Sequence, residues 1–335
     1  YSLEIKREAP MKDAKVVFLH GLHQRIVDAV VSKNPAGFTT AVVDGKTAEE
    51  QQLKMVEDAD FIMVFRADPT ERILRAARKA RLVQLLSAGY DRMNLKLLRE
   101  LKIPCANNGG ANSRAVADHT LLVMLSLYRQ LTAADRTMRE GRWGAAINGM
   151  NTFEMAGKRV GIFGFGNIGR KVARRVQSCD AVVQYYDIFP PAPELERELA
   201  VTRVSLEELF RTSDIITFHA PLTNETRHVV NREHLAMMKP TAVLINTSRG
   251  PVVDEQALIE ALQQKRIAGA GLDVFEKEPI DPGNPLLKLD NVVVTPHSAG
   301  TTWDTWFRRA EFAYQNFQRV WAGEPPEGVA TDYDL

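Results

Sequence analysis

The chain has 335 residues, of which 45% are hydrophobic and 25% charged, and its formal net charge is +1 at pH 7. The length predicts two domains of ordinary globular composition, and the small net charge excludes a strong field that would recruit nucleic acid or an anionic membrane. With only two cysteines, no apolar run as long as a membrane span and no signal-peptide core, we expect a cytoplasmic protein without a disulfide framework.

The first hundred residues alternate apolar runs with helical patterns. Strands are predicted at residues 15–20, 40–43, 60–65, 81–86 and 103–106, and helices lie between them, for example at 73–80 and 94–101. This alternation is typical of a parallel sheet with helices on both faces, which binds ligands beyond the carboxyl ends of its strands.

Two segments of this part follow predicted strands directly. Arg66 comes after the third strand, and the loop Ser87-Ala88-Gly89-Tyr90-Asp91 comes after the fourth. Arg66 is therefore a candidate substrate ligand. The backbone N–H groups of the loop could receive a carboxylate, and a plain turn between strand and helix is an equally good interpretation.

Residues 107–112, Asn-Asn-Gly-Gly-Ala-Asn, are turn formers and interrupt this pattern. A helical segment then runs from residue 113 to about residue 139, either continuous or interrupted near Leu131. Its centre, residues 120–128, is apolar nearly all round, which predicts burial as a core helix or between domains or subunits. We place a domain boundary near residue 112.

Gly164, Gly166 and Gly169 form a G-x-G-x-x-G pattern directly after an apolar run at residues 159–163. Between such a strand and a helix, the first glycine permits a tight turn and the second lets a pyrophosphate approach the backbone. The third lets the helix pack closely. Apolar residues at helical spacing between 168 and 176 predict that helix, whose first N–H groups and positive dipole end favour phosphate.

A second strand at residues 181–187 ends at Asp187, which lies 18 positions beyond Gly169. An acid at this distance is placed to accept hydrogen bonds from the adenosine ribose hydroxyls, and its charge repels the 2′-phosphate of NADP. Residues 188–191 contain no base. The sequence therefore predicts NAD rather than NADP.

The rest of the chain continues the alternation. Strands are predicted at residues 214–218, 242–246, 269–273 and 292–295, helices at 205–211, 232–238 and 254–263, and a solvated glutamate-rich face at 194–198. A last helix at 303–321 is expected to return to the first domain. The patterns predict two doubly wound parallel-sheet α/β domains, a Rossmann NAD-binding domain of residues 113–302 inserted into a flavodoxin-like substrate domain of residues 1–112 and 303–335.

Three charged side chains follow strands of the predicted cofactor domain, namely Arg249, Glu278 and His297. They should project into the crevice at the carboxyl ends of the strands, beside a nicotinamide. Reduction of a 2-oxo acid needs a fork of donors to hold the carboxylate and polarise the carbonyl, which Arg249 can supply. It also needs an acid for the carbonyl oxygen, and His297 fits that role while Glu278 stabilises the charged ring.

These residue types also have ordinary interpretations. An arginine at a strand end is usually a solvated charge, and most histidines are neither acids nor ligands. His219 is expected to wall the cofactor pocket, whereas five other histidines lack a chemical context and are interpreted as structural: His20, His23, His119, His228 and His234. No two histidines have ligand spacing with an acid or thiol nearby, so no metal is expected.

Five segments together resemble the D-isomer-specific 2-hydroxyacid dehydrogenases. They are Gly-Phe-Gly-Asn-Ile-Gly at 164–169, His-Ala-Pro-Leu-Thr at 219–223, Ile-Asn-Thr-Ser-Arg-Gly-Pro-Val-Val-Asp-Glu at 245–255, Gly-Leu-Asp-Val-Phe-Glu-Lys-Glu-Pro at 271–279 and Thr-Pro-His-Ser-Ala-Gly at 295–300. The resemblance implies that Arg249, Glu278 and His297 are the substrate-binding and acid–base residues. It further implies that the amides of Ala88 and Gly89 bind the substrate carboxylate.

The resemblance also implies an NAD site with Asp273 near the carboxamide, and a homodimer formed through the cofactor domain. The implied cofactor residues are Gly164, Gly166, Asn167, Ile168, Gly169, Asp187, Ala220, Thr247, Arg249, Asp273 and His297. Residues 303–306, Trp-Asp-Thr-Trp, depart from the usual pattern and leave the shape of the substrate pocket open. Because the sequence ends at Leu335, no appended regulatory domain is expected.

The leading hypothesis is an NAD-dependent enzyme that transfers a hydride between nicotinamide and a small 2-oxo acid or D-2-hydroxy acid, similar to glyoxylate and hydroxypyruvate reductases. Two alternatives remain. One is an NAD-sensing, corepressor-like interaction protein without catalysis, and the other is phosphite oxidation with the same three residues. Formate dehydrogenases carry glutamine where Glu278 stands, so formate oxidation is disfavoured.

Overall fold

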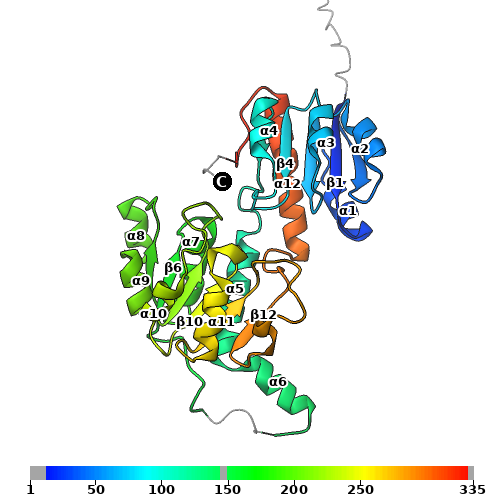
Figure 1. Ribbon diagram of the computed structural model, residues 1–335. Helices are drawn as coiled ribbons and strands as arrows, with labels where there is room; N and C mark the ends of the chain where they lie inside the picture. The colour runs from blue at the N-terminus through cyan, green and yellow to red at the C-terminus, as the bar shows by residue number, and fades with distance from the viewer. Residues whose placement is uncertain (1–12, 144–148, 331–335) are drawn as a thin grey trace, which may run out of the picture. The chain divides into compact units, whose positions relative to one another are not determined.

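The computed structural model describes residues 13–143 and 149–330, so the ends of the predicted substrate domain, 1–12 and 331–335, lie outside the described residues. The described chain divides into two compact units. The first contains residues 13–112 and 302–330, and the second contains 113–143 and 149–301. In Figure 1 the first unit runs from blue to cyan with an orange-red helix, and the second is mostly green and yellow.

The first unit is built on a five-stranded parallel sheet. Its strands are β1 (Ala14–His20), β2 (Phe38–Asp44), β3 (Phe61–Phe65), β4 (Leu82–Leu85) and β5 (Cys105–Ala106), in the order β2-β1-β3-β4-β5. This is the flavodoxin-like order, in which the direction of winding reverses between β1 and β3. Arg66 directly follows β3, so it lies at the carboxyl end of a strand beside that reversal.

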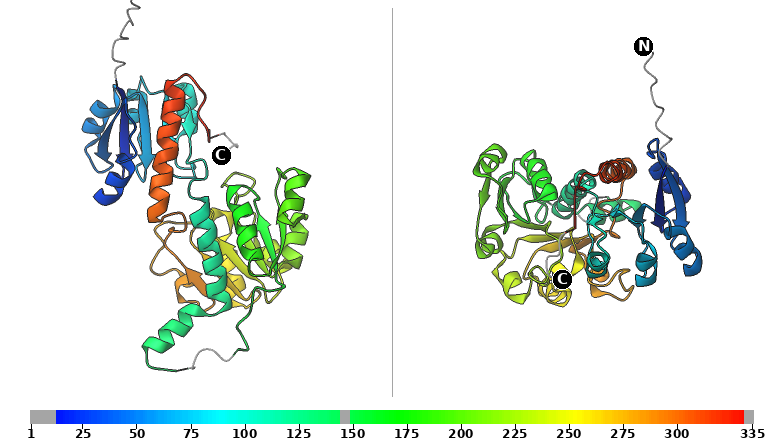
Figure 2. Two further views of the ribbon diagram at one scale, coloured as in Figure 1. Left: turned by 180° about the vertical axis from the view of Figure 1, so that it is seen from behind. Right: turned by 90° about the horizontal axis from the view of Figure 1, so that it is seen from above.

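Two helical layers cover this sheet because its strands bury alternate side chains on opposite faces. On one face, Val17 and Leu19 pack with α2 (Glu49–Val56), α3 (Glu71–Ala76) and α4 (Leu95–Glu100). On the other, Val16 and Phe18 pack with α1 (Gln24–Val31) and α12 (Trp303–Trp321). Figure 2 shows α12 lying along the sheet although almost the whole of the second unit separates the two in sequence.

Helix α12 is held to the first sheet by aromatic packing and by one buried polar contact. The ring centroids of Phe61 and Phe317 are 4.7 Å apart. Asn316 Nδ2 donates a 2.8 Å hydrogen bond to Gln84 Oε1, and both residues are buried. The amide pair satisfies two polar groups that would otherwise be costly inside the core.

The second unit is built on a seven-stranded parallel sheet. Its strands are β6 (Arg159–Phe163), β7 (Val182–Tyr186), β8 (Val201–Arg203), β9 (Ile215–Phe218), β10 (Val243–Asn246), β11 (Gly269–Leu272) and β12 (Val292–Val294), in the order β8-β7-β6-β9-β10-β11-β12. The winding reverses between β6 and β9, as in a dinucleotide-binding fold. The two parallel-sheet α/β folds predicted from sequence are therefore confirmed, and β8 is a strand that the pattern did not predict.

Helices cover both faces of the second sheet. One face carries α5 (Ser113–Tyr128) and α7 (Asn167–Gln177), and the other carries α9 (Leu206–Thr212), α10 (Arg232–Met237) and α11 (Glu255–Gln263). The remaining elements are α6 (Leu131–Arg139), α8 (Pro193–Leu199) and the short 3₁₀ turns η1 (Gly250–Val252) and η2 (Pro285–Lys288). None of the helices in the described ranges is both long and apolar enough to cross a membrane.

Helix α5 lies directly against β11. A Cβ atom at Gly271 would stand 2.2 Å from Val123 Cγ1, so this strand needs glycine to let the helix approach. The helix ends before Gln130, whose φ of 49° is left-handed, and α6 then begins at Leu131. The helical segment predicted from residue 113 is therefore interrupted close to Leu131.

Candidate functional site

The loop between β6 and α7 is shaped by its three glycines. Gly164 has a φ of 90°, and a Cβ atom there would meet the amide nitrogen of Ala220 at 2.7 Å. A Cβ atom at Gly169 would meet Gly164 O at 2.3 Å. In contrast, a Cβ atom at Gly166 would have no atom within 4 Å among the described residues outside its chain neighbours. Two glycines are thus required by the packing of the protein, and the third lines open space at the start of α7, which fits a phosphate group.

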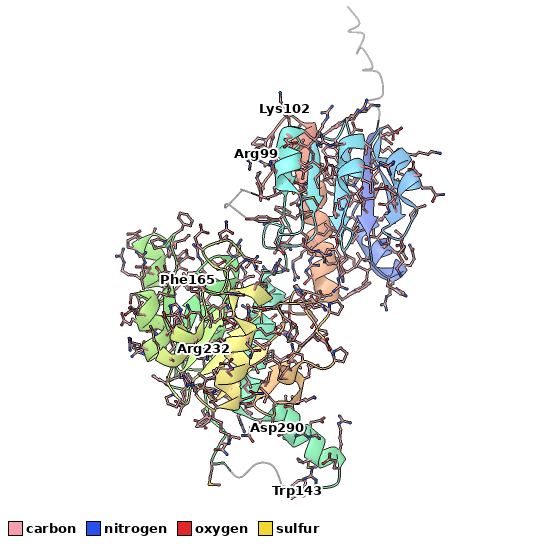
Figure 3. The ribbon with its side chains drawn as sticks, viewed as in Figure 1. Arg99, Lys102, Trp143, Phe165, Arg232 and Asp290 are labelled. Atoms are coloured by element: carbon pink, nitrogen blue, oxygen red, sulfur yellow. The ribbon has the colours of Figure 1, made fainter. Side chains whose placement is uncertain are left out.

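The intervening residue, Phe165, anchors this loop. Phe165, labelled in Figure 3, is 1% exposed. Its ring stacks on Tyr185 with a centroid separation of 4.2 Å. Asn167 and Ile168 begin α7 immediately afterwards. The aromatic contact holds the glycine loop against β7, so the N–H groups at the start of α7 are fixed in direction.

Asp187 directly follows β7 and is tied to this loop by its carboxylate. Its Oδ2 accepts a 2.5 Å hydrogen bond from the amide of Phe165, and its Oδ1 accepts one of 2.8 Å from the amide of Phe189. Each carboxylate oxygen keeps a second lone pair for a ribose hydroxyl. Arg203 Nη2 donates to the carbonyl oxygen of Asp187 at 3.3 Å. A base therefore stands beside Asp187, although none follows it in sequence.

His219 and Ala220 come directly after β9 and face the glycine loop. The amide of His219 donates to Phe163 O at 2.7 Å, and its Nε2 lies 3.0 Å from Thr217 Oγ1. Burial lowers the pKa of His219 to about 3, so the ring is neutral at physiological pH. A neutral ring suits a wall of a cofactor pocket and does not suit a proton donor.

Arg249 is positioned by the loop after β10. Asn246, which is 1% exposed, donates from Nδ2 to Arg249 O at 2.8 Å, while its Oδ1 accepts from the amide and hydroxyl of Ser248. The next residue, Gly250, lies so close to the loop after β11 that a Cβ atom would stand 1.9 Å from Phe275 O. The glycine therefore brings the Arg249 loop against the segment that carries Glu278.

Glu278 and His297 form the central pair of the site. Glu278 Oε2 lies 2.6 Å from His297 Nδ1, and Glu278 Oε1 accepts a 3.1 Å hydrogen bond from the amide of Phe275. Burial alone would raise the pKa of Glu278, but the hydrogen bond and charge of His297, the Phe275 amide and the charge of Arg249 together lower the pKa. The carboxylate is thus ionised, and His297 Nε2 remains for a ligand.

Asp273 follows β11 and is buried, with 1% of its surface exposed. It lies beneath the loop after β12 that carries His297, called the His297 loop. Its Oδ1 accepts from Thr295 Oγ1 at 2.5 Å and from the amide of Ser298 at 2.9 Å, and its Oδ2 accepts from the amide of Ala299 at 2.8 Å. Its carbonyl oxygen also accepts from the amide of His297 at 2.8 Å. Asp273 therefore organises the loop that carries His297.

The remaining predicted substrate residues lie in the first unit. Arg66 has a left-handed φ of 51°, and its guanidinium carbon lies 5.8 Å from the centroid of the Phe65 ring. Arg309 of α12 lies 5.1 Å from the same ring. Burial, followed by the charges of Arg66 and Arg308, lowers the pKa of Arg309 to about 9. Positive charge is therefore concentrated at the end of β3, where an anion would be stabilised.

Ala88 and Gly89 lie in the loop after β4, as predicted. Ser87 Oγ donates to Gly89 O at 2.8 Å and Asn107 Nδ2 donates to Ala88 O at 3.2 Å, so the carbonyl groups of this loop are tied to the protein. Within residues 13–143 and 149–330, the amides of Ala88 and Gly89 have no hydrogen-bond partner. These amides are available to an anionic ligand.

Comparison with known proteins identifies the family of this chain. A family model described as the NAD binding domain of D-isomer specific 2-hydroxyacid dehydrogenases matches residues 121–299. The chain belongs to this family. A glyoxylate reductase of Korarchaeum cryptofilum is 40% identical to this dehydrogenase over 280 residues, which are 83% of the chain and 84% of the relative.

Solved structures agree with this assignment. The D-lactate dehydrogenase of Escherichia coli has a TM-score of 0.80 and 28% identity, with 94% of this chain and 100% of that chain covered. An acyclic imino acid reductase in complex with NADPH and D-arginine has a TM-score of 0.81 and 26% identity, with 95% and 100% covered. The protein is an NAD-dependent D-2-hydroxyacid dehydrogenase, which confirms the predicted enzyme class and cofactor and argues against a non-catalytic NAD sensor.

No three histidine, cysteine, aspartate or glutamate side chains converge as a metal site within the part of the chain that the structure describes. Two side chains that contact the segments described above are not marked by any sequence pattern. Arg203 belongs to a strand of only three residues without an apolar run, and His119 lies on α5, 2.9 Å from Thr295 Oγ1. Each makes its contact with a residue of another element, Arg203 with Asp187 and His119 with Thr295.

Proposed function

We propose that this dehydrogenase reduces small 2-oxo acids, in particular glyoxylate and hydroxypyruvate, with NADH, and oxidises the matching D-2-hydroxy acids. The observation that carries the proposal is the 2.6 Å contact between Glu278 Oε2 and His297 Nδ1, with the charge of Arg249 acting on the same carboxylate. The printed name of the K. cryptofilum relative, glyoxylate reductase, favours acids with small side chains.

His297 is proposed to be the acid and base. Its Nδ1 is engaged by Glu278, so its Nε2 is the nitrogen that can donate a proton to the carbonyl oxygen of a 2-oxo acid. In the reverse direction the neutral ring takes the hydroxyl proton of the D-2-hydroxy acid. Because Glu278 is held ionised, it favours the charged ring and fixes the ring orientation.

Arg249 is proposed to hold the substrate. A guanidinium group offers several N–H donors with a permanent charge, so it can bind the carboxylate and polarise the adjacent carbonyl oxygen. Its Nη1 donates to Ser248 O at 2.7 Å, which fixes the plane of the guanidinium group. The charge of Arg249 also contributes to the lowered pKa of Glu278, after the larger effects of His297 and the Phe275 amide.

The cofactor contributes the hydride when it is bound. The open space at Gly166 and the N–H groups at the start of α7 are proposed to receive its pyrophosphate, and Asp187 its adenosine ribose. Ala220, Thr247, Asp273 and the loops of Arg249 and His297 follow strands β9 to β12, so they are proposed to line the nicotinamide end. Ile168 and Asn167 then lie at the phosphates.

The first unit is proposed to supply further substrate contacts. The amides of Ala88 and Gly89 are available donors, and the positive charge around Arg66 favours an acid substrate. We also propose a homodimer formed through the second unit. Helix α6 exposes Leu131 and Met138 and leads to Trp143, which is 87% exposed and labelled in Figure 3, so an apolar face is available for a second copy.

A substrate panel tests the proposed activity. Initial rates of NADH consumption would be measured with glyoxylate, hydroxypyruvate, phenylpyruvate and branched 2-oxo acids, and chiral analysis would follow the hydroxypyruvate product. We expect the highest kcat/KM with glyoxylate or hydroxypyruvate and a D-configured product. Absence of turnover with every oxo acid, together with NAD-dependent oxidation of phosphite, would instead establish the phosphite alternative.

A further inference from the structure

Two consecutive residues of helix α5 reach the loops that carry the proposed catalytic side chains. His119 Nε2 lies 2.9 Å from Thr295 Oγ1, which begins the His297 loop. Thr120 Oγ1 lies 3.0 Å from Thr247 Oγ1, two residues before Arg249. Because α5 is packed against β11 at Gly271, it gives both loops a rigid support.

The hydrogen atoms of the His119 contact can be assigned from the partners of Thr295. The Thr295 hydroxyl lies 2.5 Å from Asp273 Oδ1, and a carboxylate can only accept. The single hydroxyl proton therefore points to Asp273. Thr295 Oγ1 must accept from His119, so His119 Nε2 carries a proton. The result is a directed chain from His119 through Thr295 to Asp273.

This chain ends under His297. Asp273 also accepts from the amides of Ser298 and Ala299, and its carbonyl oxygen accepts from the amide of His297. The backbone of His297 itself is left-handed, with a φ of 50°, a conformation that persists only when neighbouring contacts impose it. The direction of the imidazole therefore depends on how firmly Asp273 and Thr295 hold this loop.

We propose that His119 is a positioning residue for the reaction, which acts through Thr295 and Asp273 to fix the ring of His297. The inference rests on the proposed acid–base role of His297. In this role His119 acts on the loop through Thr295 and exchanges no proton with the substrate. Its contribution is to lock the Thr295 hydroxyl toward Asp273, because without the imidazole donor that hydroxyl gains other orientations and Asp273 loses a charge-assisted hydrogen bond. Displacement of a catalytic group by a fraction of an ångström slows the chemical step.

Paired substitutions separate the donor from the bulk of the side chain. His119→Phe keeps the ring volume and removes the donor, whereas His119→Gln retains an N–H donor. Thr295→Val removes the hydroxyl at nearly constant shape, and Thr295→Ser retains it. We expect kcat to fall by at least about tenfold in His119→Phe and in Thr295→Val, with recovery to within about threefold in the Gln and Ser variants.

Three further readouts distinguish positioning from a general structural effect. The affinity for NADH, measured by fluorescence, should stay within about twofold of the parent in all four variants. The primary isotope effect on kcat with deuterated NADH should increase in His119→Phe and Thr295→Val, because hydride transfer becomes more rate-limiting. The double variant should lose no more than either single variant, since both changes break the same chain.

The controls keep the test independent of folding and of the role of His297. Leu122→Ala alters the same helix at a side chain that is 53% exposed, and its kcat should equal that of the parent. Where His119→Phe does not fold, Thr295→Val against Thr295→Ser provides the same comparison. Parental kcat in both His119→Phe and Thr295→Val overturns the inference, as does a loss in kcat that is additive or that leaves the isotope effect unchanged. Full activity of His297→Ala contradicts the proposed function instead.

Discussion

Glu278 Oε2 lies 2.6 Å from His297 Nδ1, although 19 positions separate the two residues in the chain. They meet because β11 and β12 are neighbours in a parallel sheet and the loops after both strands lie at the same edge. The amide of Phe275 holds the Glu278 side chain, and the carbonyl oxygen of Asp273 holds the backbone of His297. Proton transfer and the acid stability of the protein should therefore both depend on this pair.

The pH profile of the Glu278→Gln variant reports on the pair. Glutamine keeps the shape of the side chain but removes the negative charge that favours a protonated ring. Reduction needs the protonated ring, so its rate should begin to fall at a lower pH in the variant than in the parent. Oxidation needs the neutral ring and should persist to a lower pH. Superimposable profiles for parent and variant would show that the contact does not govern proton transfer.

The lowered pKa of Glu278 also predicts a dependence of stability on acidity. Its ordinary pKa is 4.5, so in the unfolded chain it takes up a proton at a higher pH than in the folded protein. The contribution of Glu278 to the free energy of unfolding is complete well above pH 4.5 and is lost as the pH falls toward the lower folded pKa. As the pH falls from about 5 to about 3, urea unfolding should show a smaller loss of stability in Glu278→Gln than in the parent. An equal loss in both proteins contradicts this contribution.

Cofactor choice should depend on Asp187 and Arg203 together. Asp187→Ala removes the repulsion of a 2′-phosphate, while Arg203, whose Nη2 lies 3.3 Å from Asp187 O, can then bind that phosphate. We expect the parent to prefer NADH, Asp187→Ala to use NADPH measurably, and Asp187→Ala with Arg203→Ala to lose that gain. Equal kcat/KM for the two cofactors in the parent would contradict the predicted preference.

The strongest periodic patterns gave the fold correctly. The strand predicted at residues 159–163 and the helix predicted at 303–321 have the bounds observed for β6 and α12. Both have an apolar pattern and one clear boundary. The glycine loop ends β6, and a threonine cap begins α12, since Thr302 accepts from the amide of Thr305. Residues close in sequence were therefore sufficient to predict the bounds of these two elements.

Contacts between distant segments could not be predicted in the same way. The contact of His119 with Thr295 joins residues 176 positions apart, and nothing in the neighbourhood of His119 marks it. Arg203 lies beside Asp187 because the short strand β8 pairs with β7, a pairing without an apolar pattern of its own. The motif residues are therefore recognisable from sequence, whereas the side chains that contact them from distant segments are not.

Two glycines of the cofactor loop should respond differently to the same substitution. Gly164→Ala introduces a Cβ atom 2.7 Å from a backbone nitrogen at a φ of 90° and should lower the melting temperature. Gly166→Ala meets no protein atom within 4 Å, so the melting temperature without cofactor should stay near that of the parent. Its affinity for NADH should fall by about tenfold or more, a steric cost of roughly 1–3 kcal/mol. Unchanged NADH affinity in Gly166→Ala would show that the phosphate does not bind in this space.

The central claim is that His297 exchanges the substrate proton while the glycine loop and Asp187 hold the dinucleotide. The most direct measurement is the turnover and NADH affinity of His297→Ala, side by side, with the best oxo acid from the panel. We expect kcat to fall by at least ~100-fold, as for a missing general acid, while NADH binds with nearly parental affinity. A variant that binds NADH normally and keeps parental kcat would contradict the account.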